Sequence, residues 1–208
     1  MESYGRAEDI DVIVVSDGEQ ILGIGDQGVI GILISIAKLV IYALCAGVHP
    51  NRVLPVVLDI GTDNKGLMVD DLYLDVKKPR TRGGEYDNFL DTFVQAAKKK
   101  FPAAYLHFED FGLANVRTIL DRYTPQIACF NDDVQGTGCV TLATIHAALH
   151  VSRIDIGDLR VVMFGSVSAG TGIADQIRDA ISVESGKSKE EGVKQIFCVE
   201  KPGLLLQS

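Results

Sequence analysis

Short runs of β-branched and other apolar residues alternate with helical segments along most of this 208-residue chain. The expected strands are 10–15, 53–60, 105–108, 127–130, 159–164 and 196–200. The expected helices are 32–46, 85–100, 115–123, 135–149 and a segment ending near 183. Such alternation favours helices packed on a mainly parallel sheet. We therefore predict an α/β fold with flanking helices, ending in the start of a Rossmann-like βαβ unit.

Two acidic pairs stand at the ends of consecutive expected strands. Glu109 and Asp110 follow the third strand, and Asp132 and Asp133 follow the fourth. Carboxylates at the ends of buried strands are costly unless a positive group meets them. A divalent cation held by oxygen ligands is the simplest such group. The alternative is helix capping, because Asp favours the position before a helix. For the second pair alone the two interpretations are about equal, and the repetition favours the cation.

Lys38 lies in the middle of an apolar segment, 29–48, that is expected to form a buried helix rather than a membrane span. The interruptions at Gly31, Ser35 and Lys38 argue against the span. A lysine in such a helix must reach the surface, pair with an acid, or lose its proton. Reaching the surface is the commoner outcome, but the apolar neighbours leave few exposed faces. A buried lysine can act as a general base.

Charge and cysteine usage narrow the class of protein. The net charge is -8 and no basic patch is present, which argues against a nucleic-acid partner. The cysteines have no CxxC spacing and are expected to be reduced, buried thiols of an intracellular, cytoplasmic protein. The N-terminal segment is too polar for a signal peptide. The cysteines are Cys45, Cys129, Cys139 and Cys198.

The last segment opens like a dinucleotide-binding unit. Its fingerprint is G-x-G-x-x-G after a strand, with an acid at the end of the next strand. Gly165 and Gly170 occupy two of the glycine positions, and Glu200 stands where the ribose-binding acid is expected. Val167 replaces the middle glycine, and its β-branched side chain should obstruct the pyrophosphate. The fingerprint therefore supports cofactor binding only weakly.

Five segments resemble the malic enzymes, particularly those of fungi: ILGIGDQG, LPVVLDIGTDN, HFEDFG, CFNDDVQGTG and GIADQIRDA. The similarity covers almost the whole chain. Members of the family oxidise malate with NAD or NADP, decarboxylate the resulting keto acid with Mg²⁺ or Mn²⁺, and protonate the enolate. The resemblance implies that Glu109, Asp110 and Asp133 are metal ligands. It also implies that Lys38 is the general base and that Asp132 assists it.

The family pattern also implies that the chain is truncated at both ends. The part with the tyrosine general acid and the rest of the dinucleotide domain have no counterpart, and Gln20 replaces an arginine that holds the substrate. The resemblance implies a catalytic and metal domain at 1–133 and a truncated dinucleotide-binding unit at 134–208. Tyr42 and Tyr86 are candidate replacements for the missing acid. His146 and His150 share one helix face and are expected to be packed or solvated.

We therefore expect a Mg²⁺- or Mn²⁺-dependent, non-redox lyase, decarboxylase or isomerase for a malate-like or β-keto acid, repurposed for a specialised pathway. NAD(P) binding is doubtful on this interpretation. One alternative is an ordinary NAD(P)-dependent malic enzyme, and another is a non-catalytic binding or scaffold remnant. The expected partners are a small carboxylic acid and further copies of the chain, since truncation exposes apolar faces. No membrane partner is expected.

Overall fold

The computed structural model describes residues 5–112, 114–165, 168–200 and 203–204. The chain forms two compact units, Met1–Phe130 and Asn131–Ser208. The domain boundary predicted after residue 133 falls three residues beyond the end of the first unit. The functions assigned to the two predicted domains remain predictions.

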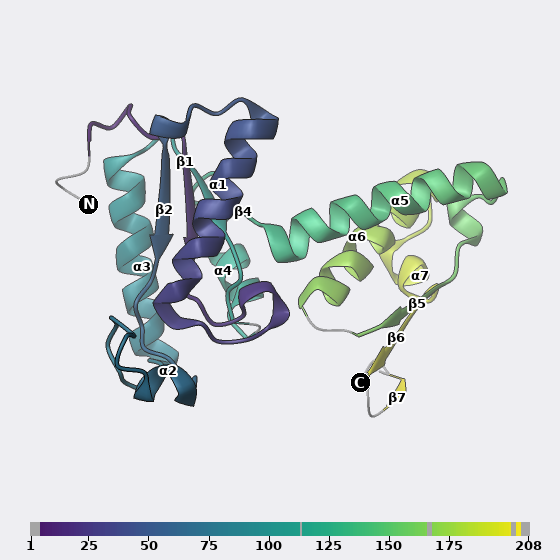
Figure 1. Cartoon of the computed structure of the whole chain (residues 1–208). Helices are drawn as coiled ribbons and strands as arrows, with labels where there is room; N and C mark the ends of the chain where they lie inside the picture. Colours follow the sequence, from purple (N-terminus) through teal and green to yellow (C-terminus); the bar gives the residue numbers. More distant parts are fainter. Residues whose placement is uncertain (1–4, 113, 166–167, 201–202, 205–208) are drawn as a thin grey trace. The chain divides into compact units, whose positions relative to one another are not determined.

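A four-stranded sheet lies at the centre of the first unit, in the order β2-β1-β3-β4 (Figure 1). β1 is parallel to β2 and β3, so Val12 pairs with both Val53 and Tyr105. All of β1 is buried, as expected for a β-branched strand covered on both faces. The strands are β1 Val12–Ser16, β2 Val53–Val57, β3 Tyr105–Phe108 and β4 Cys129–Asn131.

Alternate side chains of β1 face different helices because successive strand residues point to opposite sides. Val12 and Val14 pack with Leu39 of α1, whereas Ile13 lines a small cavity with residues of α3. The α-helices of this unit are α1 Ile32–Ala46, α2 Lys65–Val69, α3 Gly83–Lys100 and α4 Val116–Tyr123. Short 3-10 turns cover Ile21–Gly23, Gly28–Gly31 and Pro50–Arg52.

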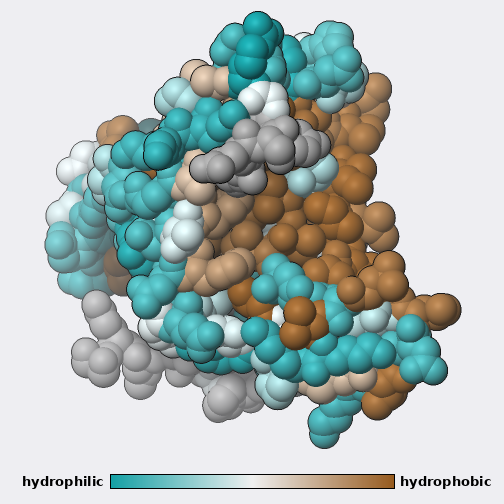
Figure 2. Space-filling model, turned by 90° about the vertical axis from the view of Figure 1, so that its left-hand side faces the viewer, coloured by the Kyte–Doolittle hydropathy of each residue, from teal (hydrophilic) through white to brown (hydrophobic). Residues whose placement is uncertain are grey.

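Helix α1 is not buried, contrary to the expectation from its apolar sequence. Only Ile34, Ser35 and Leu39 are buried, and Leu44 is 78% exposed. One face packs on β1 and β2, whereas Leu33, Val40 and Ile41 are exposed. Figure 2 shows a broad apolar area on the surface. Gly28–Ala46 is long and apolar enough to cross a membrane, which for one helix is a weak indication. Its packing on the sheet and Lys38 favour a helix of the α/β unit.

The second unit is built on a sheet of order β5-β6-β7. β5 and β6 are parallel and are joined through two helices, whereas β7 is antiparallel to β6. Leu149, Ile156, Ile177 and Ile181 form its core. The elements are α5 Thr137–Ser152, β5 Val161–Phe164, α6 Ser168–Ser185, α7 Lys189–Val193, β6 Ile196–Glu200 and β7 Gly203–Leu204, with turns at Asp132–Gly136 (π) and Ile156–Asp158 (3-10). The predicted α/β fold is confirmed.

The cysteines are free thiols, but they are not all buried. Cys129 is buried on β4, and Cys198 is partly buried on β6. Cys45 and Cys139 are exposed on α1 and α5. The expectation failed for these two because an apolar neighbourhood in sequence does not show which face of a helix packs inward.

Candidate functional site

The two acidic pairs stand at the ends of neighbouring strands of the first sheet. Glu109 and Asp110 follow β3, and Asp132 and Asp133 follow β4. The backbone N–H of Glu109 donates to the carbonyl of Val15 at 2.9 Å, which fixes the start of the turn. Glu109 and Asp110 are 2% and 5% exposed, so two carboxylates are held almost out of water. Such groups require compensation by positive charge or hydrogen bonds.

Helix capping does not account for the second pair. The residue at the N-cap is Asn131, whose side-chain oxygen accepts from the backbone N–H of Val134 at 3.0 Å. Asp132 and Asp133 lie in the first turn of a short π-helical segment. Gly136 makes room for this turn, because a Cβ there would lie 1.9 Å from Asp132 Oδ1. The contact between Gly136 and Asp132 was not recognised in the sequence, although the Gly-rich motif was a signal.

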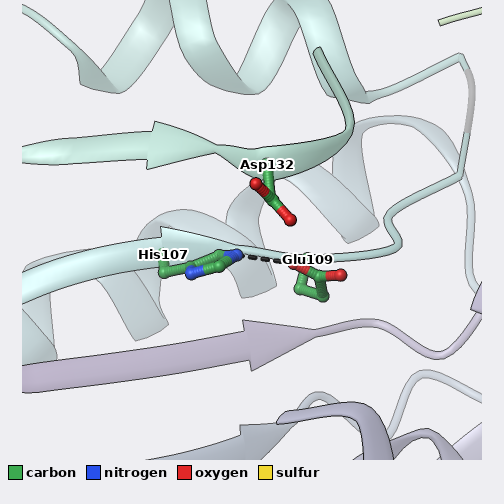
Figure 3. Close-up of side chains that lie close together, drawn as sticks. All are labelled: His107, Glu109 and Asp132. Carbon is green, nitrogen blue, oxygen red and sulfur yellow. Dashed lines mark hydrogen bonds and ion pairs between the residues drawn. The ribbon is translucent and has the colours of Figure 1, made fainter. Parts of the chain in front are cut away.

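Carboxylates of both pairs come together. Ligand oxygens of Glu109, Asp110 and Asp133 all lie within 4.8 Å of one another. Three carboxylates form the hard oxygen donor set that Mg²⁺ and Mn²⁺ prefer. The residues present therefore fit a divalent cation. A second group satisfies the same distance criterion and consists of His107, Glu109 and Asp132 (Figure 3).

Lys38 pairs with an acid, Glu109, which is one of the three outcomes expected for a lysine in an apolar helix. Its Nζ lies 3.0 Å from Glu109 Oε1, and its side chain is 23% exposed. Helix α1 thus directs its central lysine to the end of β3. The candidate base and one candidate metal ligand are in direct contact.

His107 is a site residue that the sequence did not reveal. Its Nε2 lies 2.5 Å from Glu109 Oε2, and its Nδ1 lies 3.1 Å from the hydroxyl of Tyr42. Two signals were available. His107 and Glu109 are two residues apart on one strand, and Lys38 and Tyr42 are four apart on one helix, so each pair shares a face. The pairing across helix and strand was not visible without the fold.

The Gly-rich segment after β1 supports Asp110. Leu22 N–H donates to Asp110 Oδ2 at 3.0 Å, and Gln20 N–H donates to the Asp110 carbonyl at 3.2 Å. Asp110 itself has φ 53, a left-handed conformation that is uncommon outside glycine. Residues held in such conformations cluster at functional sites. The loop therefore orients one of the candidate ligands.

A buried arginine, Arg80, holds the Gly-rich loop through hydrogen bonds. Arg80 is 5% exposed and clamps Asp26 through Nε at 2.7 Å and Nη2 at 2.8 Å. Its Nη1 donates to the carbonyl of Asp17 at 2.8 Å. Burial opposes ionisation of Asp26, but the hydrogen bonds from Arg80 and from backbone N–H groups hold its pKa down to about 2. Burial raises the pKa of Asp17 to about 6, against the opposing charge of Arg80.

The two tyrosines considered as replacement acids have different surroundings. Tyr86 donates its hydroxyl to Asp17 Oδ2 at 2.9 Å, and burial together with that carboxylate raises its pKa. Tyr42 instead contacts the imidazole of His107. Tyr42 is thus connected to the acidic cluster through His107, whereas Tyr86 contacts Asp17 at the start of the Gly-rich loop. A catalytic role for either remains a prediction.

The predicted dinucleotide elements lie in the second unit. Gly165 follows β5 with φ 98, and a Cβ on Gly170 would lie 2.1 Å from the Gly165 carbonyl oxygen. Helix α6 can therefore approach this turn only because residue 170 is glycine. Glu200 is the last residue of β6. Val167, the residue expected to obstruct the pyrophosphate, lies outside the described residues.

Known proteins match both parts of the chain. Residues 1–124 match the family model described as malic enzyme, N-terminal domain, and residues 134–208 match malic enzyme, NAD binding domain. The NAD-dependent malic enzyme, mitochondrial, of Saccharomyces cerevisiae is 52% identical over the whole chain, which covers 31% of that protein. The NAD-dependent malic enzyme of Schizosaccharomyces pombe is 48% identical over the whole chain and 36% of its own length.

A solved structure agrees on the fold. The NAD-dependent malic enzyme of Thermotoga maritima superimposes with a TM-score of 0.71 at 24% identity, over 97% of this chain and 44% of that one. The chain spans about a third of the length of the two yeast relatives.

These comparisons correct two expectations. The non-redox lyase or isomerase is wrong, because the similar proteins are named NAD-dependent malic enzymes. The doubt about NAD rested on Val167 and on the missing remainder of the dinucleotide domain, yet residues 134–208 match an NAD-binding domain. One substituted position and the shortness of the unit carried too much weight against the rest of its sequence.

Proposed function

The chain belongs to the malic enzyme family, and from that premise we propose that its protein oxidises malate with NAD and releases pyruvate and CO₂. The family resemblance found in the sequence is confirmed. One observation carries the proposal of activity. In a chain that matches both family domains, Lys38 Nζ lies 3.0 Å from Glu109, within the acidic cluster at the ends of β3 and β4.

Glu109, Asp110 and Asp133 would hold Mg²⁺ or Mn²⁺. Support comes from their oxygen donors, their grouping, and the burial of the first two. When bound, a divalent cation supplies Lewis-acid polarisation of the hydroxyl and carbonyl oxygens of the substrate. The choice between Mg²⁺ and Mn²⁺ remains open to measurement, because both accept this donor set.

Lys38 is proposed as the general base. In the oxidation step, Nζ would take the proton of the malate C2 hydroxyl, and NAD, when bound, would supply the hydride acceptor. A lysine accepts a proton only as the free amine, and a neighbouring carboxylate disfavours that form. Lys38 must then release Glu109, its partner at 3.0 Å. Asp132, half-buried in the turn after β4, would assist by receiving a hydrogen bond from Nζ.

Gly165, Gly170 and Glu200 are proposed to contact the NAD. The close approach at Gly170 and the parallel β5–β6 pair support this role. The substrate would be a small dicarboxylic acid. We also infer an intracellular protein that forms homo-oligomers: one yeast relative is named mitochondrial, and apolar residues of α1 are exposed.

A chimera tests this function. The matching segment of the Saccharomyces cerevisiae relative is replaced by this chain, and malate-dependent reduction of NAD is followed with Mn²⁺ present. We expect activity, and Lys38→Met should lower it by about a hundred- to ten-thousandfold because the base is lost. Lys99→Met, an exposed lysine at the end of α3, is the matched control. A folded chimera that oxidises no malate, or equal activity of the two variants, would refute the proposal.

A further inference from the structure

His107 is a buried imidazole that neither the proposed proton transfer nor the all-carboxylate group uses. It lies on β3 and is 2% exposed, with its Nε2 at 2.5 Å from Glu109 Oε2. Figure 3 shows the ring and the Glu109 carboxylate side by side along the strand, with Asp132 pointing towards Glu109 from the end of the neighbouring strand. A nitrogen donor therefore faces the acidic cluster.

The ring is held on its other sides. Its Nδ1 lies 3.1 Å from the Tyr42 hydroxyl, and the ring packs against Phe130 with centroids 4.4 Å apart. Tyr42 contacts it edge-on with centroids 5.8 Å apart. A metal-binding histidine uses one ring nitrogen for the metal and donates the other N–H to an outer partner. Tyr42 is placed to accept from Nδ1 while Nε2 faces the carboxylates.

We propose that His107, Glu109 and Asp132 bind a late first-row divalent cation of the Zn²⁺ class. Their ligand atoms all lie within 4.8 Å of one another. One imidazole nitrogen and two carboxylate oxygens suit Zn²⁺, Co²⁺ or Cu²⁺, whereas Mg²⁺ prefers oxygen alone. The cation would replace the direct contact between His107 and Glu109.

This position differs from the proposed Mg²⁺ or Mn²⁺ centre in its ligands but shares Glu109 with it. The inference thus rests on the proposed function only through that shared carboxylate. Because Glu109 belongs to both groups, Zn²⁺ at His107 would compete with Mg²⁺ for it. We expect Zn²⁺ to act as a competitor of the activating cation, with His107 as the residue that gives it an advantage.

Electron paramagnetic resonance of bound Cu²⁺ tests the nitrogen ligand directly. The chain has four histidines, so His146→Gln/His150→Gln removes the two histidines of α5, one partly buried and one exposed, that could also bind Cu²⁺. In this background at neutral pH, we expect hyperfine coupling to one imidazole nitrogen. Adding His107→Gln should abolish it, whereas adding His49→Gln, at an exposed position, should not. Coupling that is absent from the start, or that survives His107→Gln, would overturn the proposal.

Calorimetric titration separates a ligand from a residue that only positions Glu109. Gln keeps an N–H donor that can still position Glu109, but it removes the imidazole nitrogen. His107→Gln should therefore weaken Zn²⁺ binding at least about tenfold, because even the loss of an outer partner of a ligand costs that much. Mg²⁺ affinity should be unchanged. An equal loss for both ions, or none for Zn²⁺, would contradict direct ligation. These readouts need no turnover, so an inactive chimera that binds Cu²⁺ through His107 would refute the proposed function alone.

Discussion

Replacing Arg80 with methionine removes the clamp beneath the Gly-rich loop. Arg80 donates two hydrogen bonds to Asp26 and one to the Asp17 carbonyl. Methionine keeps most of the apolar stem but none of these donors. The Asp26 side chain, 14% exposed, would then carry its charge without a cation. Because this loop also donates to Asp110 through Leu22, the change should reach the acidic cluster.

The size of the effect follows from burial and from the pKa of Asp26. Removing one partner of a buried ion pair costs about 3–5 kcal/mol. A pKa of about 2 instead of 3.8 corresponds to about 2 kcal/mol of stability from ionised Asp26. Since the folded pKa is lowered, this part is present above pH 3.8 and is lost as the pH falls towards 2. The remainder of the roughly 3–5 kcal/mol comes from the buried Arg80 side chain and its hydrogen bond to the Asp17 carbonyl.

Urea unfolding at neutral pH measures the change. We expect Arg80→Met to lower the free energy of unfolding by about 3–5 kcal/mol. Arg80→Met/Asp26→Asn should recover part of the loss, because the Asp26 charge is then no longer left unpaired. Arg80→Lys should fall between wild type and Arg80→Met, since lysine keeps the charge but cannot form the two-pronged contact. A loss below about 1 kcal/mol, as for an exposed pair, would refute the reasoning.

Three further changes test other parts of the account. Burial raises the pKa of Asp17 to about 6, so ionising Asp17 as the pH rises towards 6 lowers the stability of the wild type. Asp17→Asn cannot ionise, so its free energy of unfolding relative to wild type should rise by about 2 kcal/mol between pH 4 and pH 7. A difference that does not change with pH would contradict this. Gly170→Ala should cost about 1–3 kcal/mol in thermal unfolding because its Cβ meets the Gly165 carbonyl; Gly84→Ala, which meets nothing within 4 Å, is the control, and equal stability of the two variants would disprove the close approach. Leu44→Gln should reduce self-association in sedimentation without lowering the melting temperature, because Leu44 is 78% exposed; unchanged association would remove α1 from the interface.

The sequence was most informative where periodicity alone determines structure. The bounds of β3, β6 and α1 agree with the predicted 105–108, 196–200 and 32–46. β4 starts at Cys129 rather than at residue 127. The preceding segment stays out of the strand, and Ile127 N–H bonds back to the Tyr123 carbonyl. Local propensity does not resolve such a turn, because the bond depends on how α4 ends.

The candidate site was only partly predictable, for a similar reason. The two acidic pairs could be placed at the ends of consecutive strands, but the choice of Glu109, Asp110 and Asp133 as one set came from the family resemblance; their ligand oxygens lie within 4.8 Å of one another. His107 was missed because its role depends on Tyr42 and Glu109, which come from different elements. The exposure of α1 was missed because apolar composition does not show whether a second layer covers a helix. Contacts between elements were thus the part that sequence patterns could not supply.

The central claim is that the acids at the ends of β3 and β4 form a divalent-cation centre. Calorimetric titration with Mn²⁺ tests it most directly, with Glu109→Gln and Asp133→Asn as the variants and Asp158→Asn, exposed in the second unit, as the control. We predict saturable binding that both site variants abolish and the control retains. Absence of saturable binding, or binding that survives both site variants, would contradict the claim.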